Sequence, residues 1–390
     1  MADNTTNNGL QPDPKATKKI RFSLRELSGS VGDFGTIFPI ILGAGIATGI
    51  NVSYAFVFIG LWFIITGIYY GLPIPIEPMK AIGAIAIAEG LTGGEIAASG
   101  IIIGLVFLII GHLKGMERIQ RWVPESVIRG IQVGLALILI RTALGYIISD
   151  LIFGAVAIGI VIFFFIASSR SGLPDISSLI VIGIGLVAGV MAQGMPPFRS
   201  IPIPELIIPA TGDWLFAAIH LAIPQMPLTL GNAILATSLL TIDLLRREVK
   251  PDTLSKTIGV MNLVSSPLGG FPMCHGAGGL AAQYRFGART GGANIIAGLL
   301  ILGFAVAFAP PEVLTLIPYG IFGGLLVFVA IELGKHGAKS PSYPVTILMA
   351  VIALIWGITP AFVIGMIASY GLERRRGWGR TMLKRRDREA

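Results

Sequence analysis

Residues 78–80, with the sequence Pro-Met-Lys, and residues 272–275, with the sequence Pro-Met-Cys-His, are two proline-led breaks inside otherwise apolar sequence. The apolar segments after them, near residues 79–91 and 274–287, are shorter than the roughly 20 residues of an ordinary membrane span. The two Pro-Met pairs lie 194 positions apart in a chain of 390 residues, so each half carries one break at a corresponding place. Matched breaks are typical of a transporter whose binding site is built from an internal repeat.

The composition indicates that most of the protein surface faces lipid. Hydrophobic residues make up 54% of the chain and charged residues 13%, and the mean hydropathy is +0.80. Soluble domains carry about 25% charged residues. The stretches 101–110, 152–167 and 296–309 contain no charged residue, as the apolar core of a bilayer requires. We therefore predict an all-α polytopic protein embedded in the lipid bilayer of the cell (plasma) membrane.

Cysteine, histidine and charge exclude several other classes of protein. The single cysteine, Cys274, excludes an intramolecular disulfide and a multi-cysteine metal site, and the four histidines are scattered. We therefore predict no metal and no cofactor. The net charge of +8 does not indicate a nucleic-acid partner, because much of the excess lies in residues 15–25 and 374–388. Basic residues that flank spans mark the cytoplasmic side, so we expect both termini to be cytoplasmic.

Hydropathy and charge together predict fourteen spans in two sets of seven. Hydropathy alone supports about ten or eleven, but fourteen places the basic loops on the cytoplasmic side and most acidic loop residues opposite. This count requires the two short broken segments, the third and tenth spans, to cross the membrane. The predicted spans lie near residues 28–49, 53–71, 79–91, 96–113, 126–148, 150–168, 177–194, 226–246, 254–268, 274–287, 292–309, 313–333, 344–358 and 359–373.

An odd number of spans in each set means that the second repeat is inverted relative to the first. Residues 32–33, Gly-Asp, correspond to residues 231–232, Gly-Asn, 199 positions later, as the two Pro-Met pairs also correspond. The predicted parts of the chain are a disordered cytoplasmic tail at 1–21, a first repeat at 22–194, an extracytoplasmic connector at 195–225, a second repeat at 226–373 and a basic cytoplasmic tail at 374–390.

The chemistry of the breaks predicts an anion site. Prolines 73, 75 and 78 exclude helix before the first break, so a helix can begin at Met79. After the second break, a helix can begin within residues 274–279, Cys-His-Gly-Ala-Gly-Gly. The first N–H groups of a helix lack intrahelical partners and carry about +0.5 elementary charge. Two facing helix N-termini therefore form an anion site, and non-helical backbone at membrane depth must be buried or line a cavity.

Lys80 adds about one positive charge to the two helix N-termini, so the site would balance a small dianion. The glycines after the second break leave room for an oxyanion to approach the backbone. Two alternatives stay open: the breaks are plain proline kinks, or Lys80 extends to the membrane interface. The predicted substrate-binding residues are Pro78, Met79, Lys80, Ala81, Cys274, His275, Gly276, Ala277, Gly278, Thr36 and Asn232.

Energetics predict a coupling ion. Moving a dianion into a cell that is negative inside costs about 4.6 kcal/mol per 100 mV, at roughly 2.3 per charge, so uptake needs co-transported cations. Asp33 lies in the first predicted span, where a carboxylate is costly and usually functional, although it can also cap a helix. We predict a proton, with sodium as the alternative, and assign coupling to Asp33 first, with Glu77 and His275 as weaker candidates. We predict no catalytic residue, because no third group orients Cys274 and His275.

Four motifs of the chain are distinctive: Glu-Leu-Ser-Gly-Ser-Val-Gly-Asp-Phe-Gly-Thr at 26–36, Pro-Met-Lys at 78–80, Pro-Met-Cys-His-Gly-Ala-Gly-Gly-Leu-Ala at 272–281 and Gln-Tyr-Arg-Phe-Gly at 283–287. Together they closely resemble the molybdate transporter family of plants, algae and prokaryotes, a divergent branch of the sulfate permease superfamily. The resemblance covers residues 22–373 and implies a uracil-permease-like fold, with a core of spans one to four and eight to eleven and a gate of the remaining spans. It also implies a homodimer.

The resemblance implies a secondary active importer of a tetrahedral oxyanion, namely molybdate. Tungstate has nearly the same size and charge, so the sequence does not separate the two. The alternative is a sulfate transporter, because sulfate is also a tetrahedral dianion and only slightly smaller. An anion channel, a third reading, would share the site but need a continuous pore.

Overall fold

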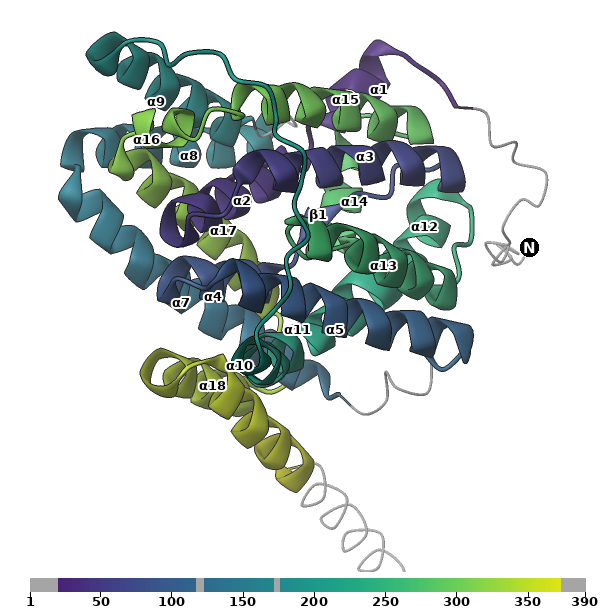
Figure 1. Ribbon diagram of the computed structural model, residues 1–390. Coiled ribbons are helices and arrows are strands. Elements are labelled where there is room, and N and C mark those ends of the chain that lie inside the picture. The colour runs from purple at the N-terminus through teal and green to yellow at the C-terminus, as the bar shows by residue number, and fades with distance from the viewer. Residues whose placement is uncertain (1–19, 117–122, 172–175, 373–390) are drawn as a thin grey trace, which may run out of the picture.

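The computed structural model describes residues 20–116, 123–171 and 176–372, which form a bundle of helices (Figure 1). The prediction of a mainly helical membrane protein is confirmed. Among the described residues, the helices long and apolar enough to cross a bilayer are Leu24–Thr48, Val52–Tyr70, Gly93–His112, Glu125–Ser149, Thr211–Leu245 and Tyr319–Gly337. Shorter apolar helices are Leu151–Ala167, Ser177–Gln193, Gly291–Ala307, Tyr343–Trp356 and Ile358–Leu372.

The elements follow one another along the chain in two groups separated by a long connector. The first group is α1 (Leu24–Ser30), α2 (Phe34–Thr48), α3 (Val52–Tyr70), β1 (Glu77–Pro78), α4 (Lys80–Glu89), α5 (Gly93–His112), α7 (Glu125–Ser149), α8 (Leu151–Ser171) and α9 (Ser177–Gln193). The second is α10 (Thr211–Phe216), η1 (Ala217–Ala222), α11 (Ile223–Leu228), η2 (Thr229–Ala236), α12 (Thr237–Leu245), α13 (Pro251–Ser265), η3 (Ser266–Leu268), β2 (Met273–Cys274), α14 (Ala277–Arg285), α15 (Gly291–Ala307), α16 (Glu312–Leu316), α17 (Tyr319–Gly337) and α18 (Tyr343–Trp356).

The helix from Thr211 to Leu245 corrects the predicted connector at residues 195–225, because residues 211–225 are helical. This helix contains Pro224 and Pro227, which cannot donate a backbone hydrogen bond to the preceding turn. The π-helical segments η1 and η2 lie on either side of the two prolines, and local π turns are a recognised way of accommodating such an interruption. Within the predicted connector, residues 195–210 have no helix or strand, and they cross the bundle from α9 to α10 (Figure 1).

Proline also divides the span predicted near residues 313–333. The short α16 ends at Leu316, and α17 begins only at Tyr319, with Pro318 as its N-cap. Proline fixes its own backbone and disfavours helix in the residue before it. The membrane-crossing helix is therefore displaced toward the C-terminus and ends at Gly337.

Small residues allow the longest helix pairs to pack closely. Helix α3 packs along α15, and α5 packs along α13. A Cβ atom added to Gly298 of α15 would lie 2.5 Å from the Gly60 carbonyl oxygen of α3. One added to Gly104 of α5 would lie 3.1 Å from the Gly259 carbonyl oxygen of α13. Glycine is thus required or strongly favoured at these crossings, as at many contacts between membrane helices. Elsewhere, α17 packs against α7 and α8, and α18 packs against α7.

The two breaks pair with each other in the middle of the bundle, where β1 lies (Figure 1). β1 and β2 form an antiparallel ladder in which Glu77 is opposite Cys274 and Pro78 is opposite Met273. The Met79 N–H donates to the Pro272 carbonyl at 2.8 Å. Buried backbone groups need such partners in a membrane, where no water replaces them.

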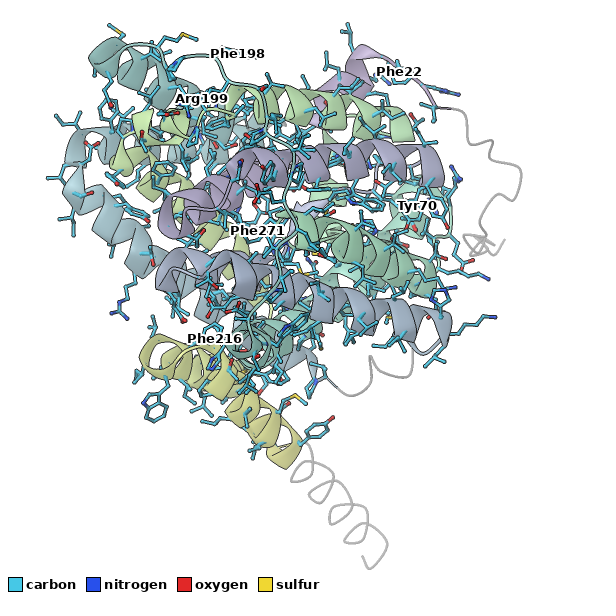
Figure 2. The ribbon with its side chains drawn as sticks, viewed as in Figure 1. Phe22, Tyr70, Phe198, Arg199, Phe216 and Phe271 are labelled. Carbon is cyan, nitrogen blue, oxygen red and sulfur yellow. The ribbon has the colours of Figure 1, made fainter. Side chains whose placement is uncertain are left out.

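Buried amide side chains complete this pairing. The Asn262 Nδ2 donates to the Met273 carbonyl at 2.6 Å, and the Asn262 Oδ1 accepts from the Met273 N–H at 2.9 Å. The Asn294 side chain donates to the Ile74 carbonyl on the opposite break. Phe271, two residues before Met273 in the second break, is buried deep within the bundle (Figure 2). Helices α13 and α15 therefore hold the non-helical backbone in place.

We expect Asn262→Leu to destabilise the fold. It would leave the Met273 N–H and carbonyl without their side-chain partner in a buried site, at a cost of about 1–3 kcal/mol for each group. The apparent melting temperature of purified protein in detergent should fall clearly. Ser178→Ala is the control, because the buried Ser178 hydroxyl has no hydrogen-bond partner among the described residues. Equal melting temperatures for Asn262→Leu and the unmodified protein would contradict this role.

Candidate functional site

Helices α4 and α14 begin next to each other at the β1–β2 ladder. The N-cap of α4 is Met79, and the N-cap of α14 is Gly276. Met79 was predicted as the first residue of its helix, and the structure differs by one position. Cys274 and His275 precede α14 instead of opening it, because Cys274 belongs to the β-ladder. The breaks thus place two helix N-termini in the buried centre of the protein.

Each of these helix N-termini already has a side chain as a hydrogen-bond partner. In α14, the Gly279 N–H donates to the Glu77 Oε1 at 3.1 Å. In α4, the Ala81 N–H donates to the Gln225 Oε1 at 2.9 Å, and the Gln225 Nε2 donates to the Thr229 hydroxyl at 3.0 Å. The backbone donors predicted for a substrate therefore bind a carboxylate and an amide of the protein itself.

Lys80 points into the same centre. Its Nζ lies 2.6 Å from the Glu77 Oε2, and the Glu77 side chain is only 1% exposed. The alternative in which Lys80 extends to the membrane interface is wrong, since its ammonium group is paired with the buried Glu77 carboxylate and the Lys80 side chain is only 15% exposed. Taking both charges out of water is costly unless they are well paired, which fits a functional reason for their presence.

Asp33 adds a second carboxylate to the first turn of α14. It is the N-cap of α2 but makes no capping hydrogen bond, and it is 3% exposed. Its Oδ2 has no hydrogen-bond partner among the described residues. A Cβ atom on Gly279 would lie 2.5 Å from the Glu77 Oε1 and 2.6 Å from the Asp33 Cγ. Glycine at this position therefore lets both carboxylates approach the helix.

Glu332 of α17 is the third carboxylate, and sequence analysis missed it. It is half-buried and close enough to interact electrostatically with Asp33 and Lys80. The sequence did contain a signal for Glu332, because a carboxylate inside an apolar stretch of sequence is usually functional. Gln225 was also missed, and it carried no comparable signal. The centre thus holds three carboxylates and Lys80, and the basic residues Arg285, Lys335 and His336 line the adjoining cavity together with Asp33 and Glu332.

Two cavities and one smaller space adjoin this centre. The first cavity, of about 300 Å³, is lined by residues that include Asp33, Thr36, Gly278 and Glu332. The second, of about 290 Å³, lies between α7 and η2 and is lined by residues that include Gln132 and Asn232.

The smaller space shares Gln132 and Asn232 with the second cavity and is also lined by Glu77, Lys80 and Cys274. Its volume of about 20 Å³ has room for about one water molecule. The part of the predicted site between Lys80 and Cys274 is therefore filled by side chains of the protein, whereas Thr36 and Gly278 line the open first cavity.

The structure brings most of the predicted binding residues together. Residues 78–81 and 274–278 surround the two helix N-termini, while Thr36 and Asn232 line the adjoining cavities. His275 is different, because it is fully buried and both ring nitrogens have protein partners. Its Nδ1 donates to the Pro75 carbonyl at 3.1 Å, and its Nε2 lies 2.8 Å from the Thr257 hydroxyl. His275 therefore links the two breaks instead of facing a cavity.

Known proteins resemble this chain in sequence and in fold. The family described as "Molybdate transporter of MFS superfamily" matches residues 25–139 and 217–333. "Molybdate transporter 2" of Arabidopsis thaliana is 32% identical over 391 residues, which cover 85% of this chain and 82% of that protein.

Two solved structures share the fold. The transmembrane domain of the cyanobacterial bicarbonate transporter BicA superposes with a TM-score of 0.64 at 18% identity, covering 90% of this chain and 98% of that one. The murine Solute Carrier 26 family member A9 anion transporter, in its inward-facing state, superposes with a TM-score of 0.70 at 13% identity, covering 92% of this chain and 70% of that one.

We expect Gly276→Ala to abolish anion binding, whereas Gly278→Ala should be tolerated. A Cβ atom on Gly276 would lie 1.7 Å from the Glu77 Oε1 and would fill the space beside the N-terminus of α14. The nearest atom to a Cβ on Gly278 is the Glu332 Oε1 at 4.0 Å, which is ordinary contact. Binding of radiolabelled molybdate to purified protein checks this, and equal affinities for the two variants would refute the placement.

Proposed function

Because this chain belongs to the molybdate transporter family, as its four motifs predicted, we propose that it is a secondary active importer of a tetrahedral oxyanion, with molybdate as its substrate and tungstate also accepted. The family is one of transporters, so the prediction that the chain is not an enzyme is confirmed. The observation that carries the proposal is the buried centre in which α4 and α14 begin beside Lys80.

The positively charged donors of this centre, counted without its carboxylates, support a dianion as the substrate. Two helix N-termini supply roughly one positive charge in total, and Lys80 supplies one more. A tetrahedral oxyanion presents oxygen acceptors in several directions, so it can accept from both helices and from the ammonium group. The deciding experiment is uptake into proteoliposomes, with molybdate, tungstate, sulfate and phosphate in competition. Preference for sulfate over molybdate would favour the alternative reading.

The inverted repeat is part of the proposal, and two symmetric features support it. A contact across the two breaks has its counterpart in the structure: Pro78 lies opposite Met273, and the residues 194 positions away from these two, Pro272 and Met79, are joined by the Met79 N–H to Pro272 carbonyl hydrogen bond. The glycine contact of α3 with α15 also has a counterpart in that of α13 with α5. Gly259 follows Gly60 by 199 positions, and Gly298 follows Gly104 by 194.

The packing of the helices supports a division into core and gate. Helix pairs α3–α15 and α5–α13 associate within one set, and α7, α8, α17 and α18 associate within the other. In this scheme, Asp33, Glu77 and Lys80 belong to the core, and Glu332 belongs to the gate. Movement of one set against the other would change the distance between Glu332 and the core charges. Fourteen spans, cytoplasmic termini in the plasma membrane and a homodimer complete the proposal, the last resting on the family resemblance alone.

Proton coupling is supported by the buried carboxylates. An arriving dianion adds negative charge beside Asp33 and Glu77, which are both almost fully buried. Like charges at close range strongly disfavour each other in such an environment. Protonation of Asp33, whose Oδ2 lacks a partner among the described residues, relieves this repulsion and carries a compensating charge with the substrate.

We expect Lys80→Ala to weaken molybdate binding about ten- to hundred-fold, the equivalent of 1.5–3 kcal/mol for a charge-assisted hydrogen bond. Lys250→Ala is the control, because Lys250 also carries a positive charge but is exposed at the N-cap of α13 and lines neither the cavities nor the small space described above. Equilibrium dialysis of monodisperse protein measures both affinities. A change of less than about twofold for Lys80→Ala would remove its assigned role.

We expect Asp33→Asn to bind molybdate but to lose accumulation driven by an acidic outside pH. The asparagine keeps the size of the side chain but cannot carry a proton. Asp243→Asn, an exposed position at the end of α12, is the control and should retain pH-dependent uptake. Full accumulation by the Asp33→Asn protein would exclude Asp33 as the proton carrier, and a requirement for sodium would overturn the proton model.

A further inference from the structure

The Glu77 carboxylate occupies the position that the sequence assigns to the substrate. Its Oε1 accepts from the Gly279 N–H at the start of α14, and its Oε2 lies 2.6 Å from the Lys80 Nζ. These are a helix N-terminus and an ammonium group, the two kinds of donor that would recognise an oxyanion. The protein therefore already holds an anion at its own anion site.

The surrounding space is shaped to this carboxylate. A Cβ atom on Gly276 would overlap the Glu77 Oε1, and the free volume beside Glu77 and Lys80 is only about 20 Å³. A tetrahedral oxyanion and the carboxylate thus cannot occupy the N-terminus of α14 together. A second observation points to an exchangeable charge here, because the buried Asp33 Oδ2 beside the same helical turn has no partner among the described residues.

We propose that Glu77 is a resident competitor: its carboxylate occupies the oxyanion site when substrate is absent, and the incoming dianion displaces it. This inference rests on the proposed function and adds to it the group that the substrate must replace. Affinity then reflects the difference between two anions binding the same donors. The opposite role is a permanent support, in which Glu77 holds Lys80 in position and stays in place when the substrate binds.

Competition gives a definite direction to the pH dependence of binding. A proton on Glu77 removes the charge that holds it to Lys80 and to α14, so molybdate should bind more tightly as pH falls. The titratable groups around Glu77 are Asp33 of α2, Lys80 of α4, Cys274 and His275 at β2, and Glu332 of α17. Each is therefore kept unchanged in the variant that tests Glu77.

Cys274 provides a reporter inside the site. It is the single cysteine of the chain and lines the small space together with Glu77 and Lys80. Its labelling rate is measured with an anionic and with a cationic methanethiosulfonate of similar size. Both reagents react with the Cys274 thiolate, so the ratio of their rates does not depend on the fraction of Cys274 that is ionised. The ratio therefore reports how readily the site admits an anion compared with a cation. Cys274→Ser is the background control.

We expect Glu77→Gln to raise the anionic-to-cationic rate ratio about tenfold or more, whereas Glu77→Asp, which keeps the charge, should stay near the unmodified protein. Asp33→Asn is the matched charge control, because it removes one carboxylate from the same centre but leaves Glu77 on α14. Equal shifts for Glu77→Gln and Asp33→Asn would show a general electrostatic effect and overturn the proposal.

Equilibrium dialysis with radiolabelled molybdate gives the second readout. Glu77→Gln should bind molybdate about tenfold more tightly at neutral pH, by release of one charge-assisted bond, and its affinity should vary less with pH. Weaker binding of molybdate by Glu77→Gln would show that Glu77 is a permanent support for Lys80 and would overturn its proposed role as a competitor of the substrate. If the unmodified protein binds no oxyanion, the proposed function fails. The ratio of anionic to cationic labelling rates of Cys274 still decides whether the Glu77 carboxylate occupies an anion site. If Glu77→Gln does not fold, a rate ratio for the unmodified protein that does not rise at acidic pH would overturn the proposal.

Discussion

Backbone hydrogen bonding inside a membrane is the constraint on which the rest of this structure depends. Prolines interrupt two spans near the centre of the protein, and lipid offers no partner for the exposed N–H and carbonyl groups. The two breaks therefore pair with each other through the β1–β2 ladder. Asn262 and His275 bind the remaining groups from the side. Once the breaks are held in this way, two helix N-termini have to face the protein interior, and they attract anionic and polar partners.

The parts of the fold that follow from local backbone chemistry were predictable from sequence. Proline disfavours helix, so Pro78 and Pro272 predicted the two interruptions. The matched spacing of these breaks predicted that they form one site together. The same rule failed at Pro224 and Pro227, where the chain stays helical through two π-helical segments. Proline alone does not reveal whether a helix ends or widens, since the outcome depends on neighbouring helices that supply partners for the freed groups.

Residues that act from a distance were harder to predict than the breaks. Gln225 binds the Ala81 N–H across 144 positions of sequence, and no motif marks it as a partner of α4. Glu332 was detectable as a lone intramembrane carboxylate, but its place beside Asp33 depends on how α17 packs against α2. The glycines near residue 276 were predicted to make room for an oxyanion. The structure shows that this room holds the carboxylates of Glu77 and Asp33.

Charge balance connects these features to transport. A centre with enough positive potential to bind a dianion would be unstable when empty, because unpaired buried charge is costly. Carboxylates resolve this conflict, since they neutralise Lys80 and the helix N-termini between transport cycles. They then create a second conflict when the substrate arrives, because the centre becomes too negative unless a cation enters or a carboxylate leaves. Proton uptake and side-chain displacement are the two responses available to Asp33 and Glu77. The proton coupling that we propose therefore needs no separate device, because it would follow from keeping one small buried space close to neutral.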